Sequence, residues 1–115
     1  MELLKKYVKL GSRVALYVPG TIDINHASDT SEWVASVSLA FSHMFGGATS
    51  SACAGYWGDD VAGLVTENVT VVYSYTDTET LKKTIDKVLA IAHDMKKSLN
   101  QSAVTLEVNR AIYFI

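Results

Sequence analysis

The chain has 115 residues, of which 49% are hydrophobic, and its formal net charge is −2. That length suits one domain spanning residues 1–115, and the composition supplies a core without disulfides or metal. The charge disfavours DNA or RNA as a partner, because neutralising phosphates requires clustered cations. Cys53 is the single cysteine, which excludes an intrachain disulfide and a cysteine-based metal cluster.

The first residues mix Lys5, Lys6 and Lys9 with short apolar pairs. They lack the apolar run of about 7–15 residues that marks a signal peptide. No stretch approaches the ~20 apolar residues of a membrane span. We therefore expect a protein of a reducing cytoplasm with no membrane partner.

The first predicted strand is the apolar run at residues 14–18, which Pro19 ends because proline cannot extend a hydrogen-bonded ladder. Residues 20–28 are small or polar and predict a loop. Residues 48–57 predict a second strand, in which Gly55 allows a bulge.

Two amphipathic helices are predicted. Asp29 and Glu32 form a capping-box pattern, and apolar residues then recur at helical spacing up to the stop signal at Gly46 and Gly47. A second helix starts near Asp77 and runs to about residue 99, with an apolar stripe along one face. On its surface, Glu79 and Lys83 stand in the favourable i,i+4 order.

The remaining strands complete an α+β order of β-α-β-β-α-β-β. After a turn at residues 58–60, residues 69–75 form the clearest strand, since they are β-branched and aromatic almost throughout. Residues 103–108 and 111–115 predict a hairpin around Asn109 and Arg110, although arginine fits the second position of a type I′ turn poorly. The expected product is a sheet of about five strands with two helices, which leaves a face or edge that favours oligomerisation.

No convincing catalytic set is visible. Cys53 is expected to be a small, partly buried strand residue, and His26, His43 and His93 share no motif and predict surface positions. The adjacent carboxylates Asp59–Asp60 are typical of a solvated turn. A protein that binds a ligand, rather than an enzyme, follows more naturally, and no metal or cofactor is implied.

The chain resembles the phage Thoeris anti-defence protein 1 family over roughly residues 14–115. The resemblance rests on L-Y-V-P-G-T at 16–21, F-G-G-A-T at 45–49, G-Y-W at 55–57, the strand region 64–74, E-V-N at 107–109 and Y-F at 113–114. Residues 1–12 are then an N-terminal extension beyond the shared part.

The resemblance implies a sponge in the host cell cytoplasm. Members of the family bind cyclic ADP-ribose isomers that TIR enzymes of the Thoeris defence make from NAD, and they do not cleave them. Some also capture cyclic oligonucleotides, and the family is described as dimers that assemble into hexamers. Two alternatives stay open: a structural or protein-binding α+β dimer, and a small nucleotide-processing enzyme.

The ligand residues are chosen on chemistry. Stacking suits adenine, arginine suits a diphosphate, and hydroxyl or amide groups suit the riboses. The residues expected to bind the ligand are Arg110, Asn109, Tyr113, Tyr56, Trp57 and Thr49.

Overall fold

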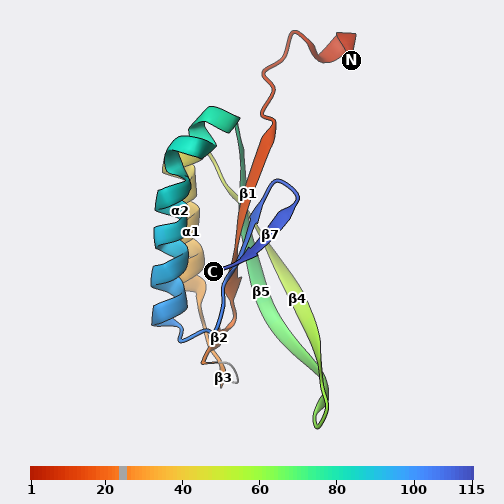
Figure 1. Ribbon diagram of the computed structural model, residues 1–115, viewed down its shortest axis with the longest axis vertical. Coiled ribbons are helices and arrows are strands. Elements are labelled where there is room, and N and C mark those ends of the chain that lie inside the picture. The colour runs from red at the N-terminus through yellow and green to blue at the C-terminus, as the bar shows by residue number, and fades with distance from the viewer. Residues whose placement is uncertain (24–25) are drawn as a thin grey trace.

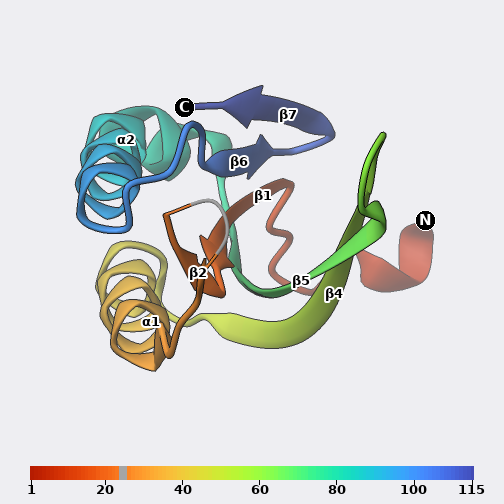
Figure 2. The same ribbon diagram turned by 90° about the horizontal axis from the view of Figure 1, so that it is seen from below.

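Two helices lie side by side on one face of an antiparallel sheet in the computed structural model, which describes residues 1–23 and 26–115 (Figures 1 and 2). The elements in chain order are a short 3₁₀ helix η1 (Glu2–Leu4), β1 (Ser12–Pro19), β2 (Thr21–Ile22), β3 (His26–Ala27), α1 (Ser31–Phe45), β4 (Thr49–Asp59), β5 (Gly63–Thr76), α2 (Thr78–Ser98), β6 (Thr105–Val108) and β7 (Ala111–Phe114).

The main sheet has the strand order β4-β5-β1-β6-β7, so the first long strand of the sequence lies at its centre. Leu16 of β1 is the Cα partner of both Val72 on β5 and Leu106 on β6. All four strand pairs are antiparallel. The predicted α+β class, with five strands and two helices, is confirmed.

The hydrophobic core lies between the sheet and the helices because alternate residues of each strand point to the same face. On the central strand β1, Val14, Leu16 and Val18 point toward the helices and are fully buried. They pack against an apolar stripe from each helix, which includes Phe41 of α1 and Met95 of α2. The helices are amphipathic, so this packing buries their apolar stripes and leaves the charged residues exposed.

The start of α1 differs from the predicted capping box. Thr30 is the N-cap residue, and its hydroxyl donates to the Pro19 carbonyl (2.7 Å) instead of capping the helix. Asp29 still accepts a hydrogen bond from the Ser31 N–H (3.0 Å). The long-range bond to the end of β1 therefore fixes where α1 begins. Its end is as predicted: Gly46 is in the left-handed region, with φ 86°.

Helix α2 has the predicted start, because the Asp77 carboxylate accepts from the Thr80 N–H (2.8 Å). The expected surface pair of Glu79 with Lys83 is replaced by Glu79 with Lys82, whose Nζ lies 4.0 Å from the carboxylate oxygen. Both members of that pair are exposed, so the exchange has little energetic weight.

The hairpin of β4 and β5 is longer than the sequence pattern predicts. Strand β5 starts at Gly63, and the turn lies at residues 60–62. Gly55 pairs directly with Glu67 and the register continues through it, so the bulge allowed there is absent. Backbone pairing needs no apolar side chains, so the polar residues Thr66, Glu67 and Asn68 continue the ladder of β5 without a sequence signal.

The segment predicted as a loop at residues 20–28 contains the small β2–β3 pair, and residues 24–25 lie outside the described part. At the other end of the chain, the β6–β7 hairpin is confirmed. Asn109 takes the left-handed conformation, with φ 57°, whereas Arg110 does not. The turn is therefore not type I′, which needs positive φ at both central residues.

Replacing Gly20 by alanine should destabilise the fold. A Cβ at Gly20 would overlap the backbone carbonyl oxygen of Asn68, and backbone cannot move aside as a flexible side chain can. We expect a loss of about 1–3 kcal/mol in the free energy of unfolding, measured by urea titration. Gly58→Ala is the matched control because a Cβ there meets nothing within 4 Å. Equal stability of the two variants would contradict the close approach of Gly20 to β5.

Candidate functional site

The sheet face opposite the helices carries the polar and aromatic side chains. Figure 2 shows both helices on one side of the sheet, so that the other side is uncovered. The pairing register places the following residues on this open face: Arg13 and Tyr17 of β1, Glu67, Val69, Tyr73 and Tyr75 of β5, Thr49, Cys53 and Trp57 of β4, Thr105 and Glu107 of β6, and Ile112 and Phe114 of β7.

Arg13 is the centre of one half of the open face. Its Nε donates to a Glu107 carboxylate oxygen (3.1 Å), and its Nη1 donates to the Tyr75 hydroxyl (3.3 Å). The guanidinium also lies over the Tyr73 ring, 4.2 Å from its centroid. Cation–π and charge-assisted contacts of this kind hold a guanidinium in one orientation. Arg13 is therefore fixed in place with donors left over, because a guanidinium has five.

Tyr17 lies between the Arg13 cluster and a cavity on the same face. Its hydroxyl donates to the other Glu107 oxygen (3.3 Å). Burial, followed by the Glu107 charge and this hydrogen bond, raises the pKa of Tyr17 above its ordinary value. For Arg13, burial lowers the pKa, but the bonds to Tyr75 and Glu107 outweigh it and raise the pKa overall. Arg13 therefore stays cationic and Tyr17 stays protonated at neutral pH.

A cavity of about 240 Å³ lies next to Tyr17 on the same face. Trp57 and Glu67 line it from the β4–β5 hairpin, and residues 101–105 form its opposite wall. The Trp57 side chain is 44% exposed and Glu67 is half-buried. Among the described residues, no cation lies within ion-pair distance of Glu67. The cavity thus offers an aromatic surface and a carboxylate without a salt-bridge partner.

The Gln101 side chain fixes the wall of this cavity. Its amide nitrogen lies within hydrogen-bond distance of the carbonyls of Asp23 (2.9 Å), Leu99 (3.0 Å) and Thr21 (3.2 Å). These contacts hold the segment after α2 against the turn after β1. The cavity is therefore lined by a rigid loop on one side and strands on the other.

The open face suits a ligand with an aromatic base and a positive charge. Trp57 and Tyr17 supply aromatic surface for a base. Glu67 and Glu107 supply negative charge, and Arg13 supplies a fixed cation. At about 240 Å³, the cavity is smaller than typical small-molecule sites of ~300–1,000 Å³. It has room for one part of such a ligand.

The residues predicted to bind the ligand fall into two groups at opposite edges of the sheet. Thr49, Tyr56 and Trp57 lie on the edge strand β4. Trp57 lines the cavity, Thr49 lies on the same face near Tyr73, and Tyr56 points to the other face, 63% exposed. Within one chain, only Trp57 of this group belongs to the cavity.

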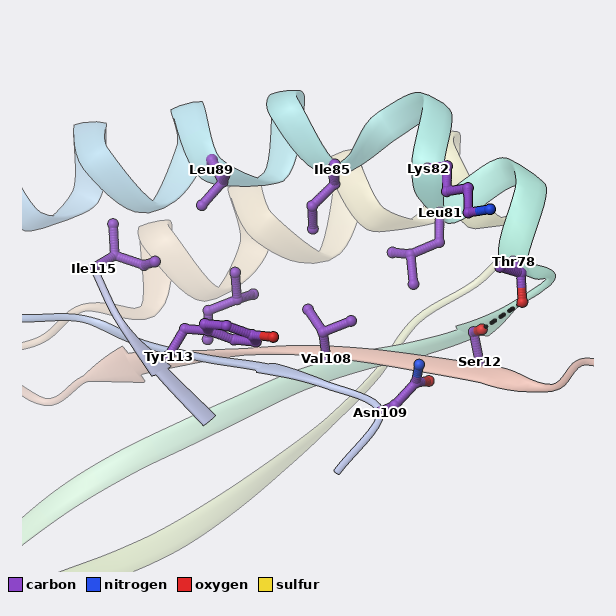
Figure 3. Close-up of a pocket in the computed structure, with 11 residues that line it drawn as sticks. Ser12, Thr78, Leu81, Lys82, Ile85, Leu89, Val108, Asn109, Tyr113 and Ile115 are labelled. Carbon is purple, nitrogen blue, oxygen red and sulfur yellow. Dashed lines mark hydrogen bonds between the residues drawn. The ribbon is translucent and has the colours of Figure 1, made fainter. Parts of the chain in front are cut away.

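The second group lies around the β6–β7 hairpin. Asn109 holds its turn against β1, since its N–H donates to the Arg13 carbonyl (2.7 Å) and its side-chain oxygen accepts from the Arg13 N–H (3.0 Å). Arg110 is exposed in the turn. Tyr113 points to the helix side and lines a groove beside α2 (Figure 3). The structure therefore does not unite the six residues within one chain.

Sequence reasoning missed Arg13, Tyr17, Glu67 and Glu107. The available signal was alternation: Arg13 directly precedes the apolar run of β1 and Tyr17 lies within it, and their spacing of four residues places them on one face. Glu67 lay before the start that was predicted for its strand. Its position became clear only once the β4–β5 pairing was known.

Other candidates for chemistry are dispersed. Cys53 is exposed on β4 rather than partly buried as expected, because β4 is an edge strand and no helix covers this face. His26, His43 and His93 are exposed. Within residues 1–23 and 26–115, no three His, Cys, Asp or Glu side chains are grouped to hold a metal ion. None of the described helices has the length and apolar character to cross a membrane.

Replacing Glu107 by glutamine should lower the pKa of Tyr17 toward its ordinary value, because it removes the negative charge beside the phenol. We expect the corresponding step in an ultraviolet titration of tyrosine to move to lower pH. Tyr17→Phe in the same background identifies the step by removing it. If the titration curves of the parent and Glu107→Gln proteins coincide, the two groups do not interact in solution.

Two solved structures share this fold. A phage SAM lyase in complex with S-methyl-5′-thioadenosine has 19% sequence identity and a TM-score of 0.67, over 97% of this chain and 94% of the other. A phage SAM lyase in the apo state has 23% identity and a TM-score of 0.65, over 95% and 94% of the chains. The sequence matches no known protein-family profile. It also matches no curated protein.

These comparisons correct one expectation and refine another. The chain was predicted not to be an enzyme. That prediction is contradicted, because both similar structures are of enzymes, phage SAM lyases. The expected nucleotide-like ligand has a parallel in the methylthioadenosine of the first structure. Neither similar structure is named as a member of the Thoeris anti-defence protein 1 family, so the predicted membership of that family is not confirmed. The fold of this chain is the fold of phage SAM lyases.

Proposed function

We propose that the chain binds S-adenosylmethionine on the open sheet face and cleaves it, releasing methylthioadenosine. The observation that carries this proposal is the grouping of aromatic, carboxylate and guanidinium side chains on the uncovered face of a lyase fold. The ligand carries an adenine, a sulfonium, an ammonium and a carboxylate. On this face, Trp57 suits the adenine, Glu67 suits the positive charges and Arg13 suits the carboxylate.

The charges of the face favour a cationic ligand over a polyphosphate. Glu67 and Glu107 lie there, and the fixed cation Arg13 already pairs with Glu107. Glu67 attracts the positively charged part of the ligand, and Trp57 stacks on the adenine. The remaining N–H groups of Arg13 meet the ligand's carboxylate. A cyclic ADP-ribose isomer would instead place a diphosphate near two carboxylates.

The reaction needs no cofactor. The bond between sulfur and Cγ of the methionine part breaks, and its electron pair stays on sulfur, so the sulfonium becomes a neutral thioether. The substrate's own carboxylate oxygen forms the new bond to Cγ, which gives a lactone and consumes no water. Opposite charges disappear in this step, so a partly desolvated site favours it over bulk water. The chain's residues hold the substrate folded, with the carboxylate oxygen in reach of Cγ.

The first experiment mixes the protein with S-adenosylmethionine and follows methylthioadenosine by mass spectrometry, with water labelled with oxygen-18. We expect many turnovers per chain and a four-carbon product without the label. Glu67→Gln should lower kcat/KM about 10- to 100-fold, because it removes a charge-assisted contact. Tyr56→Phe and Lys87→Ala serve as controls, since Tyr56 points to the other face of the sheet and Lys87 is exposed on α2, and both should stay within twofold of the parent.

The sequestration of a cyclic ADP-ribose isomer stays a prediction, and the same protein preparation tests it. Recovery of intact S-adenosylmethionine, together with tight binding and intact release of a cyclic ADP-ribose isomer, would overturn the lyase proposal. A loss of that binding in Arg110→Ala but not in Glu67→Gln would then place the ligand at the β6–β7 hairpin.

A further inference from the structure

The first ten residues form an amphipathic segment. At 100° per residue, the apolar side chains gather on one half of a helical wheel and the charged ones on the other. The apolar half holds Met1, Leu3, Leu4, Tyr7, Val8 and Leu10, and the charged half holds Glu2, Lys5, Lys6 and Lys9. Amphipathic segments of this kind become stably helical when their apolar face is packed against a partner.

In the structure, this N-terminal arm (residues 1–10) makes only one 3₁₀ turn, η1, and extends away from the body beyond the start of β1 (Figure 1). Its apolar side chains are open to solvent: Met1 is 90% exposed, Leu3 80% and Val8 90%. A cluster of exposed apolar side chains next to charged ones is typical of a surface that binds a partner.

A matching surface lies between α2 and β7 (Figure 3). This α2–β7 groove has a volume of about 380 Å³ and an almost wholly apolar lining. Leu81, Ile85 and Leu89 line it from α2, and Val108, Tyr113 and Ile115 line it from the β6–β7 side. A hydrogen bond between the Ser12 and Thr78 hydroxyls (3.2 Å) lies at one end.

We propose that the N-terminal arm of one chain docks as a helix into the α2–β7 groove of a second copy. A ten-residue helix is ~15 Å long, and the part of α2 from Leu81 to Leu89 spans ~12 Å, so the lengths match. The arm carries three lysines and one glutamate, and the rest of the chain has a net charge of −4, so the arm and the body of another copy attract each other at long range. Lys82 is the charged residue that lines the groove, so the contact itself rests on the apolar side chains.

The arm of the same chain does not fit this groove. Ser12 already lines the groove end, and only Gly11 separates it from the arm, which runs in the opposite direction. One residue is too short a link to reverse the chain and place a helix one layer away. A second copy supplies the same arm without this constraint, as in other exchanges of a terminal segment between identical chains.

Disulfide trapping tests the proposal in a Cys53→Ser background. One protein carries Leu4→Cys and the other carries Ile85→Cys, and the two are mixed under mild oxidation. We expect a mixed dimer on a non-reducing gel. In the control, Lys6→Cys on the charged half of the arm replaces Leu4→Cys. The yield of mixed dimer should then be at least fivefold lower. Equal yields from both positions, or no mixed dimer, would overturn the proposal.

Two further measurements separate the remaining outcomes. A chain carrying both Leu4→Cys and Ile85→Cys that cross-links within itself at high dilution would show that the arm occupies its own groove, which contradicts the proposal. Deleting residues 1–10 removes no buried residue, so the chain should still fold. Sedimentation should then show a lower oligomeric state than that of the full chain at equal concentration. An unchanged oligomeric state would contradict arm docking. Neither readout depends on lyase activity.

Discussion

The placement of both helices on one side of a single sheet governs the rest of this structure. Strand β1 lies at the centre of the sheet, so its residues Val14, Leu16 and Val18 form the middle of the core. The alternate residues Arg13 and Tyr17 must then point to the face that no helix covers. The same alternation that builds the core therefore also builds a polar and aromatic surface on its other side.

That surface is organised before any ligand arrives. Arg13 contacts Glu107, Tyr75 and Tyr73, and Glu107 also accepts from Tyr17. These contacts already restrict the side chains in the free protein. Binding a ligand therefore costs less conformational entropy. Glu67 is different, because no described cation neutralises it beside the Trp57 ring. A site that combines a held guanidinium with a free carboxylate and an aromatic surface suits a ligand carrying charges of both signs.

Much of the fold could be predicted from the sequence because it rests on local signals. The Asp77 cap, the left-handed Gly46 and the apolar stripes of both helices follow from neighbouring residues. The true start of α1 could not be predicted, since it depends on a bond from Thr30 to Pro19 in another element. The start of β5 was missed because backbone pairing with β4, rather than its side chains, makes residues 63–68 a strand.

The site was harder to predict than the fold for a related reason. Trp57 was expected to bind the ligand and lines the cavity, whereas Glu67, Tyr17 and Glu107 come from three strands that only the sheet order unites. Arg110 and Asn109 were chosen on chemistry. Asn109 holds a turn against β1, and both residues line a hollow with Arg13 and Glu107 rather than the cavity beside Tyr17. Residue type alone could not show that Asn109 makes structural contacts to the Arg13 backbone.

The most direct test of the central claim is a crystal structure of the protein with methylthioadenosine. We predict that the adenine lies against Trp57 on the open sheet face, with the thioether sulfur directed toward Tyr17 and the cluster of Arg13 and Glu107. A nucleoside bound at the β6–β7 hairpin or on the helix side, with this cavity empty, would contradict the account.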